Sequence, residues 1–320
     1  FRSGTYVFDQ TGTNLDLTRT VRIGTVDVDV ATGLEYRHET YETRAGEPAS
    51  YAAGPLALAI GAQGAPGLDP DDERSVSRDV GGAYLEVGLR PTERLLIEGA
   101  VRVETYSDFG ETLTGKLAGS YAITPAVRLR GAVSNSVRAP FLGQTAFTDR
   151  TVNFGVGGTL ASTRTLPVSD PIARSLGAED LREERAFNLS AGVTAKPIAG
   201  LTLSLDAFRI KVDDRITLSD RFFGPALEAF VQAQPGGAGL QSVRFFTNAV
   251  DTQTTGVDAV AQWRIPFSTG QLTLGAAWSY AETEITGRRA TPVALLALDP
   301  AFALIGVEEV NTLEEAAPRW

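Results

Sequence analysis

Cysteine and methionine are absent from this chain of 320 residues, and histidine occurs only once. Without cysteine the chain forms neither disulfides nor thiolate sites for catalysis or metal binding. The sequence starts at Phe1, with no methionine and no signal peptide, so we expect it to be an excised part of a longer protein. Thiol chemistry is excluded, and any function must rest on other residue types.

Long apolar runs and an excess of positive charge are also missing. No run of about 18 apolar residues occurs, which excludes a transmembrane helix. The formal net charge of -10 argues against a nucleic-acid partner, because binding to phosphates requires excess lysine and arginine. A strand that crosses a membrane needs only about 9–11 residues with one apolar face. The composition is therefore compatible with a membrane β-barrel and with a soluble protein.

Apolar and polar residues alternate with a period of two along most of the chain. In residues 95–104, Ile97, Val101 and Val103 share one face, and Glu98 and Arg102 lie on the other. Residues 127–134 and 272–280 repeat the pattern, which predicts half-buried strands and an all-β fold. A soluble β-sandwich would show the same alternation, so the pattern alone leaves both architectures open.

The connections between the predicted strands differ in length at the two ends. Tight turns are predicted at residues 90–93, 123–126, 196–200 and 266–270, and they alternate with other connections. Those others are mostly long, at residues 46–78, 139–181, 220–241 and 287–320, with a short exception at 106–110. Transmembrane barrels have short periplasmic turns and long extracellular loops. This asymmetry favours a transmembrane antiparallel β-barrel.

The segment Ser134–Gln144 ends one alternating strand and opens the longest loop. It resembles the GFRAPSL signature in the barrel of TonB-dependent outer-membrane receptors, with Val137 in place of Phe and Phe141 in place of Ser. Blocks similar to barrel segments of siderophore receptors follow in the same order as in that family, at residues 33–39, 46–51, 106–110, 115–117, 205–210, 213–216 and 248–258. The resemblance covers nearly the whole chain.

The resemblance implies that residues 1–320 are part of a single barrel domain. We count about ten strands, whereas plugged outer-membrane transporters have about 22, so we expect a partial barrel without its plug and last strands. The implied function is active uptake of a scarce large solute, most simply a ferric siderophore, across the outer membrane of a Gram-negative bacterium. Vitamin B12, heme and an oligosaccharide are alternative cargoes. A passive porin and a soluble β-sandwich binding module are the alternative functions.

The resemblance also implies the partners. A TonB–ExbB–ExbD complex would act through the absent plug, the loops would bind cargo, and the outer surface would contact lipid and lipopolysaccharide. We expect no enzymatic activity, no catalytic residue and no cofactor. His38 is interpreted as a solvated residue near a strand end, the acidic run Asp69–Glu73 as a solvated loop, and Gly155–Gly158 as a flexible loop that lacks a phosphate-binding motif.

Cationic and aromatic residues of the long loop are the candidate cargo contacts, because such groups suit capture of an anionic chelate. The alternative for the arginines is ion pairing with acidic residues of the same loop or with lipopolysaccharide phosphates, and for Arg138 it is closure of the polar strand face. These candidates are Arg138, Phe147, Arg150, Phe154 and Arg164.

The two faces of the strands have opposite expected surroundings. Charged residues of mixed sign should face the lumen, namely Glu98, Arg102, Glu104, Lys116, Arg128, Arg130, Asp206, Asp258 and Arg264. Leu129, Val133, Leu203, Leu274 and Ala276 should face lipid. Tyr121, Trp263, Trp278 and Tyr280 are expected near the two membrane interfaces, where aromatic girdles lie.

Overall fold

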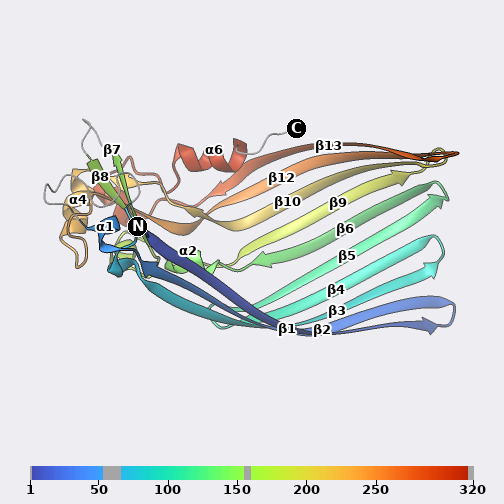
Figure 1. Cartoon of the computed structure of the whole chain (residues 1–320), viewed down its shortest axis with the longest axis horizontal. Helices are drawn as coiled ribbons and strands as arrows, with labels where there is room; N and C mark the ends of the chain where they lie inside the picture. The colour runs from blue at the N-terminus through green and yellow to red at the C-terminus, as the bar shows by residue number, and fades with distance from the viewer. Residues whose placement is uncertain (1, 53–65, 155–159, 316–320) are drawn as a thin grey trace.

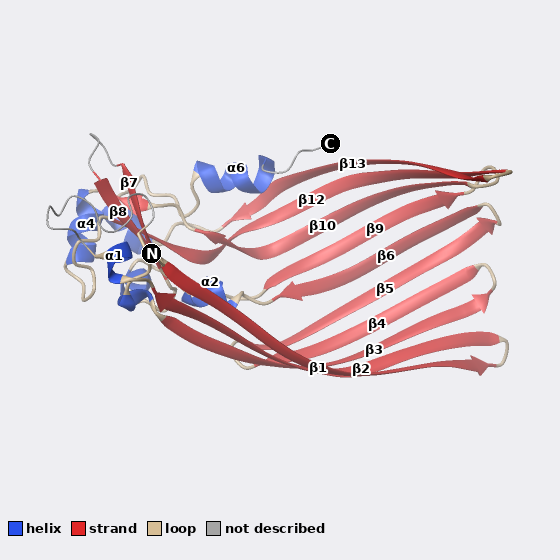
Figure 2. Ribbon diagram, in the orientation of Figure 1, coloured by secondary structure: helices blue, strands red, loops and turns tan. Residues whose placement is uncertain are grey.

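The computed structural model describes residues 2–52, 66–154 and 160–315, and it describes their side chains except at 152–154, 160 and 161. Among these residues, no helix has the length and apolar character required to cross a membrane. Strands dominate the structure, and they lie side by side in one large curved sheet (Figures 1 and 2).

Ten long strands of the described residues form the body of this sheet, and each pairs antiparallel with the next long strand along the chain. They are β1 (Gly4–Ile23), β2 (Val26–Ala45), β3 (Arg74–Thr92), β4 (Leu95–Tyr106), β5 (Gly110–Thr124), β6 (Val127–Arg138), β9 (Glu184–Ala195), β10 (Leu201–Leu218), β12 (Ser242–Phe267) and β13 (Gly270–Arg288). The number agrees with the count of about ten strands from the sequence. The segment before Gly24, whose conformation the alternation does not define, is strand β1.

Tight turns gather at one end of the sheet and long connections at the other (Figure 1). All four tight turns predicted from the sequence connect consecutive strands at the first end, and the β1–β2 turn joins them there. We call this end the turn rim. At Gly200 in one of these turns φ is +78°, and an added Cβ would meet the carbonyl oxygen of Arg264, so the turn requires glycine. The opposite end is the loop rim.

The described parts of the long connections at the loop rim are folded, which the sequence does not predict. These parts contain three short strands, β7 (Asp149–Phe154), β8 (Leu160–Leu166) and β11 (Phe222–Phe223). They also contain the 3₁₀ turn η1 (Pro70–Asp72) and six helices among the described residues, namely α1 (Pro48–Tyr51), α2 (Leu142–Ala146), α3 (Pro171–Ser175), α4 (Pro225–Gln232), α5 (Val293–Leu298) and α6 (Val307–Glu315).

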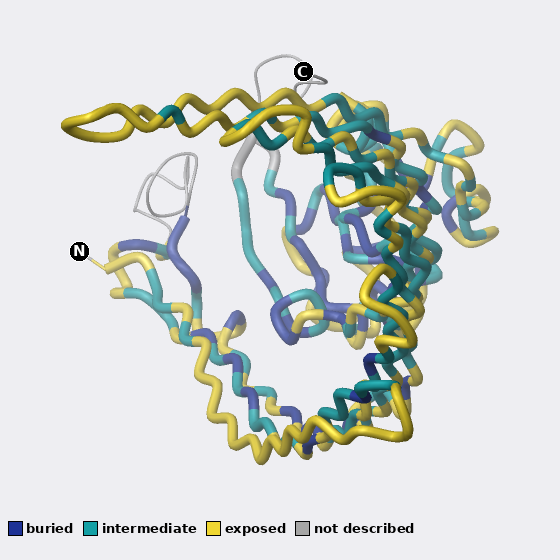
Figure 3. Tube along the Cα trace, turned by 90° about the vertical axis from the view of Figure 1, so that its right-hand side faces the viewer, coloured by how far each residue is buried: buried dark blue, intermediate teal, exposed yellow. Residues whose placement is uncertain are grey.

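The sheet is curved, with a concave and a convex face. Viewed from the turn rim, it forms an open arc, and segments of the loop rim lie inside its outline (Figure 3). The concave face carries Tyr41, against which Phe141 and Leu142 of the longest loop pack. Registers place all nine residues expected to face the lumen on this concave face.

The convex face is apolar and exposed. The registers place on it all five residues expected to face lipid, Leu129, Val133, Leu203, Leu274 and Ala276. Leu117, Leu189 and Trp278 share this face and are exposed. An exposed apolar surface of this extent is unfavourable in water, and in a membrane it would contact lipid.

The strands are longer than a membrane crossing requires. β3 and β12 have 19 and 26 residues, whereas a crossing needs about 9–11, so parts of these strands would extend beyond a bilayer.

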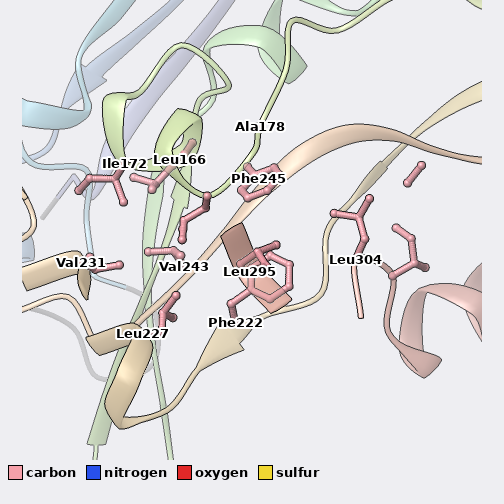
Figure 4. Packing of buried hydrophobic residues seen from close by; sticks show 14 of the residues in the cluster. Leu166, Ile172, Ala178, Phe222, Leu227, Val231, Val243, Phe245, Leu295 and Leu304 are labelled. Atoms are coloured by element: carbon pink, nitrogen blue, oxygen red, sulfur yellow. The ribbon is translucent and has the colours of Figure 1, made fainter. Parts of the chain in front are cut away.

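Among the described residues, the largest hydrophobic core lies at the loop rim. Sixteen buried residues, from several connections and from the loop-rim part of β12, pack into one cluster, which includes Leu166, Phe222, Val243, Phe245 and Leu295 (Figure 4). The rings of Phe222 and Phe245 lie 5.9 Å apart. We call this assembly the dome. Burial on this scale joins these connections into one packed unit rather than a set of independent loops.

Two sequence interpretations are wrong. His38 does not lie near the end of its strand, because β2 continues to Ala45, and its Nδ1 lies 2.7 Å from Asp79 across the sheet. The acidic run Asp69–Glu73 is not simply solvated, because Asp72 is 1% exposed and is bonded to other loop residues. The glycine-rich segment Gly155–Gly158 lies outside the described residues.

Candidate functional site at the loop rim

The base of the longest connection is closed by an ion pair. Arg138 is the last residue of β6, Glu184 is the first of β9, and the two are register partners. The Arg138 Nε donates to Glu184 Oε2 at 2.8 Å, and the Ile216 backbone N–H donates to the other carboxylate oxygen at 2.7 Å. Arg138 thus joins the two ends of the loop, which agrees with the structural alternative for this residue.

The first residues of the loop turn back against the concave face. Pro140 ends strand pairing, and α2 follows and contacts β2 and β3. The Phe141 ring lies 5.2 Å from that of Phe8 and 6.1 Å from that of Tyr41, and the Phe147 ring stacks on Tyr6 at 6.1 Å. Phe147, a candidate cargo contact, therefore belongs to an aromatic group at the loop-rim ends of β1 and β2.

A buried arginine of the wall holds this turn. The Arg78 guanidinium on β3 is 4% exposed and donates to Glu39 Oε2 at 2.6 Å and to the Pro140 carbonyl at 2.9 Å. Asp108, in the short β4–β5 connection, lies 3.4 Å from it, and the centre of the Tyr106 ring lies 5.5 Å from it. Arg78 therefore connects three strands and the loop through one planar group.

A second buried ion pair connects two different loops. The Arg164 Nη2 on β8 donates to Asp72 Oδ1 at 2.6 Å, and the Thr148 hydroxyl donates to the same oxygen at 3.1 Å. Asp72 also accepts from the backbone N–H of Asp69, which makes it part of a capping box. Since both charged groups are largely removed from water, each depends on the other for compensation. The guanidinium of Arg164, a candidate cargo contact, is thus bound to Asp72.

Asp149 is a carboxyl in this same region with an altered acidity. Burial raises its pKa, the negative charge of Asp72 adds to the effect, and the positive charge of Arg244 only partly offsets it. The raised pKa means that the protonated form stabilises the folded loop. This stabilisation is complete below the ordinary pKa of aspartate and is lost as the pH rises through the raised value.

We therefore expect the segment around Asp149 to open more readily as the pH rises from about 4. Hydrogen exchange of residues 148–151 in the purified full-length receptor, corrected for intrinsic rates, should show this dependence, and Asp149→Asn should flatten it. Glu315→Gln, which changes an exposed carboxyl at the end of α6, is the control. An unchanged pH dependence in Asp149→Asn would show that another group is responsible.

Arg150 differs from the other two arginine candidates. Its Nε is buried, and no hydrogen-bond acceptor lies within reach of it among the described residues. Its register partner is Arg164, so two guanidinium groups lie on the same face of the β7–β8 hairpin, and Arg164 already binds Asp72. A buried donor without an acceptor is unfavourable, and an anionic group would relieve it. The side chain of the fifth candidate, Phe154, lies outside the described residues.

The longest loop is also joined to the far side of the arc. Strand β8 pairs in parallel with the first residues of β12, from Ser242 to Phe245, and the Thr163 and Ser242 hydroxyls lie 2.5 Å apart. The loop thus extends from β2 and β3 to β12, which are separated in the sheet by β4, β5, β6, β9 and β10. Its described parts therefore contact both sides of the concavity at the loop rim.

The concave wall below the loop is lined with charges. Arg102 pairs with Glu35 and with Glu104, the latter at 2.7 Å, and Arg130 forms a forked pair with Asp206. A hollow of about 280 Å³ lies beside this second pair, and Glu98, Lys116 and Ser120 also line it. Within the described residues, no group of histidine and carboxylate side chains has a metal-binding arrangement.

Sequence reasoning missed Arg78, Glu39 and Asp72, which organise the site. Only the alternation of β3, which puts Arg78 on the polar face, could have indicated that it faces inward. Its contact with Pro140 spans 62 residues, and the Asp72–Arg164 pair spans 92. No local pattern encodes such pairings.

Comparison with known proteins gives a consistent result. A family model described as "TonB dependent receptor-like, beta-barrel" matches residues 1–300. No curated protein matches the sequence. The motif around Arg138 and the family model, which are independent of the structure, thus point to one family.

Solved structures share the fold at low sequence identity. The siderophore receptor PirA of Pseudomonas aeruginosa is similar with a TM-score of 0.58 and 14% identity, over 88% of this chain and 45% of that one. A mutant of the ferric enterobactin receptor PfeA of the same species, in complex with enterobactin, gives 0.56 and 15%, over 88% and 36%. The RagAB peptide importer gives 0.55 and 14%, over 88% and 31%. The chain spans less than half the length of each of these structures.

Proposed function

Because this chain belongs to the family of TonB-dependent receptor-like β-barrels, we propose that it forms part of a receptor for active uptake across the outer membrane of a Gram-negative bacterium. Residues 1–320 would be part of a single barrel domain. The observation that carries the proposal is the asymmetry of the sheet, which has an apolar convex face, a charged concave face and folded connections at one rim only. In such a sheet the folded connections of the loop rim offer a surface that can bind cargo, whereas the turn rim has only tight turns.

The cargo that we propose is a ferric siderophore or a similar large anionic solute. The solved structures that share the fold include two siderophore receptors, and this likeness supports the proposal. Two features of the loop rim also support this cargo: the Arg150 Nε, a buried donor without an acceptor among the described residues, and the aromatic group around Phe147. Of the candidates for cargo contact, Arg150 and Phe147 suit direct contact, and Arg138 and Arg164 support the loop through their ion pairs. Phe154 stays a prediction from the sequence alone.

The partners follow from the same proposal. The convex face would contact outer-membrane lipid, with lipopolysaccharide around its loop-rim end. The concave face, with its mixed charges, would contact a plug, and the TonB–ExbB–ExbD complex would act on that plug to release cargo inward. Covalent chemistry has no part in this function.

Binding of ferric chelates tests the proposal at the loop rim. The full-length receptor in detergent should bind at least one of a set of ferric catecholate, ferric hydroxamate and ferric citrate complexes, as measured by quenching of intrinsic fluorescence. Arg150→Ala should weaken binding about tenfold, because a charged hydrogen bond in a site shielded from water is lost. Arg185→Ala, an exposed arginine of β9 paired with Glu183, is the control. Binding of heme or vitamin B12 alone would replace the proposed cargo, and binding of none of these would contradict the proposal.

A further inference from the structure

We propose that Arg78 is a positioning residue that holds the first part of the longest loop, residues 139–148, against the barrel wall, and that this attachment opens separately from the dome. We call residues 139–148 the entrance segment. The inference rests on the proposed function, because it concerns the path by which cargo reaches the concavity. Arg78 itself lies outside the loop and is not among the candidate cargo contacts.

Pro140 requires a hydrogen-bond donor from outside the loop. It is buried, and its carbonyl needs a partner once the chain leaves the sheet. Arg78 supplies the donor at 2.9 Å. Because the guanidinium is also fixed by Glu39 and Asp108, the carbonyl is bound to a group that cannot follow the loop if the loop moves.

The remaining attachment of the entrance segment is smaller than the core of the dome. Against the wall, this segment buries the cluster of Tyr41, Leu142 and Ala146, with Val76 beside it, and its two phenylalanine rings contact Tyr6, Phe8 and Tyr41. At its last residue, the Thr148 hydroxyl donates to Asp72. The dome buries sixteen hydrophobic residues and is joined to β12 by the parallel ladder of β8. Segments with few buried apolar contacts open at lower free energy than the cores beside them. The entrance segment is therefore the end of the loop that detaches first.

The entrance segment and the dome lie at different places on the loop rim. The segment lies against β2 and β3, which α2 contacts, and the dome lies at the loop-rim end of β12, on the other side of the sheet order (Figure 1). Release of the entrance segment would open the mouth along the wall while the dome stays folded. Arg78 sets how often this occurs.

Thiol labelling in a chain without cysteine tests this inference directly. Ala146→Cys places a thiol where the side chain is 5% exposed in the entrance segment, and Ala173→Cys places one where it is 0% exposed in the dome. Each is introduced into the full-length receptor, and labelling by a membrane-impermeant maleimide is followed on intact cells. Val293→Cys, at a position that is 82% exposed at the loop rim, reports surface orientation.

Arg78→Ala should raise the labelling rate of the Ala146→Cys thiol about tenfold or more, because charged and buried hydrogen bonds are lost. Arg37→Ala is the matched control, since Arg37 also binds Glu39, at 2.6 Å, and has no bond to Pro140 among the described residues. It should change that rate by less than about twofold. The Ala173→Cys thiol should stay protected in both backgrounds. Arg78→Lys keeps the positive charge but lacks the planar guanidinium with its several donors, so it should give an intermediate labelling rate. This variant replaces Arg78→Ala in the test if Arg78→Ala does not assemble in the membrane.

Two results would overturn the inference. Equal labelling of the Ala146→Cys thiol in Arg78→Ala and Arg37→Ala would show that Arg78 does not hold the segment. A parallel rise at Ala146→Cys and Ala173→Cys would show that segment and dome open as one unit. Failure of the outer-membrane placement on which the proposed function rests gives a different result, because Val293→Cys would then remain unlabelled on intact cells.

Discussion

Ala276→Arg destabilises the folded full-length receptor by about 2–4 kcal/mol, and Ala277→Arg by much less. The two alanines are neighbours in β13, but Ala276 pairs with Ala261 on the convex face and Ala277 pairs with Val260 on the concave face. Ala276 lies seven positions from Thr269 of the turn, near the expected midplane of the bilayer. A guanidinium at Ala276 would lose its water, whereas one at Ala277 would remain hydrated or contact other polar groups.

Reversible unfolding in lipid vesicles measures both costs. The two positions have the same residue type, strand and depth. The difference between their unfolding free energies therefore reports only which face of the sheet carries the arginine. A second pair, Leu274→Arg at a convex position and Arg130→Ala at a concave one, should show the same contrast. Small and equal costs for Ala276→Arg and Ala277→Arg would mean that the convex face does not contact hydrocarbon, and would restore the soluble β-sandwich as an explanation.

Arg164→Leu weakens the loop-rim assembly by about 3–5 kcal/mol, because it leaves the buried Asp72 carboxylate without its cation. The double replacement of Arg164→Leu with Asp72→Asn should recover part of this loss, since no uncompensated charge remains. Hydrogen exchange of residues 142–148 and 162–166 measures the local free energy of opening. Unfolding of the whole barrel is less informative, because the pair joins loops and not strands.

Arg174→Ala is the control for this prediction. Its partner Asp180 is 85% exposed, and ion pairs exposed to water contribute only about 0–1 kcal/mol. If Arg164→Leu and Arg174→Ala have similar small effects on exchange, the Asp72–Arg164 pair does not join the two loops.

The strands were predictable from the sequence because their signals are local. Alternation in residues 95–104 fixes which side chains share a face, and residues such as Pro125 and Gly200 mark where each hairpin turns. The ten long strands, the four tight turns and the assignment of charged residues to one face follow from these signals, and the structure confirms them.

The loop rim was not predictable in the same way. The parallel pairing of β8 with β12 and the packing of Phe222 on Phe245 join segments that are far apart in the sequence, so no local pattern predicts them. Asp72 looked like one member of a solvated acidic run, because sequence does not show that Arg164 covers it. Arg138 and Arg164 were reasonable as cargo contacts from composition, but their charged neighbours in space are carboxylates of the chain itself.

Energy-dependent uptake is the central claim, and transport of a radiolabelled ferric siderophore by intact cells tests it most directly. Cells whose only siderophore receptor is the full-length protein should accumulate the iron of the complex that it binds, and deletion of TonB or collapse of the proton gradient should abolish accumulation while surface binding remains. Accumulation that persists without TonB and rises linearly with solute concentration would contradict this claim and identify a passive porin.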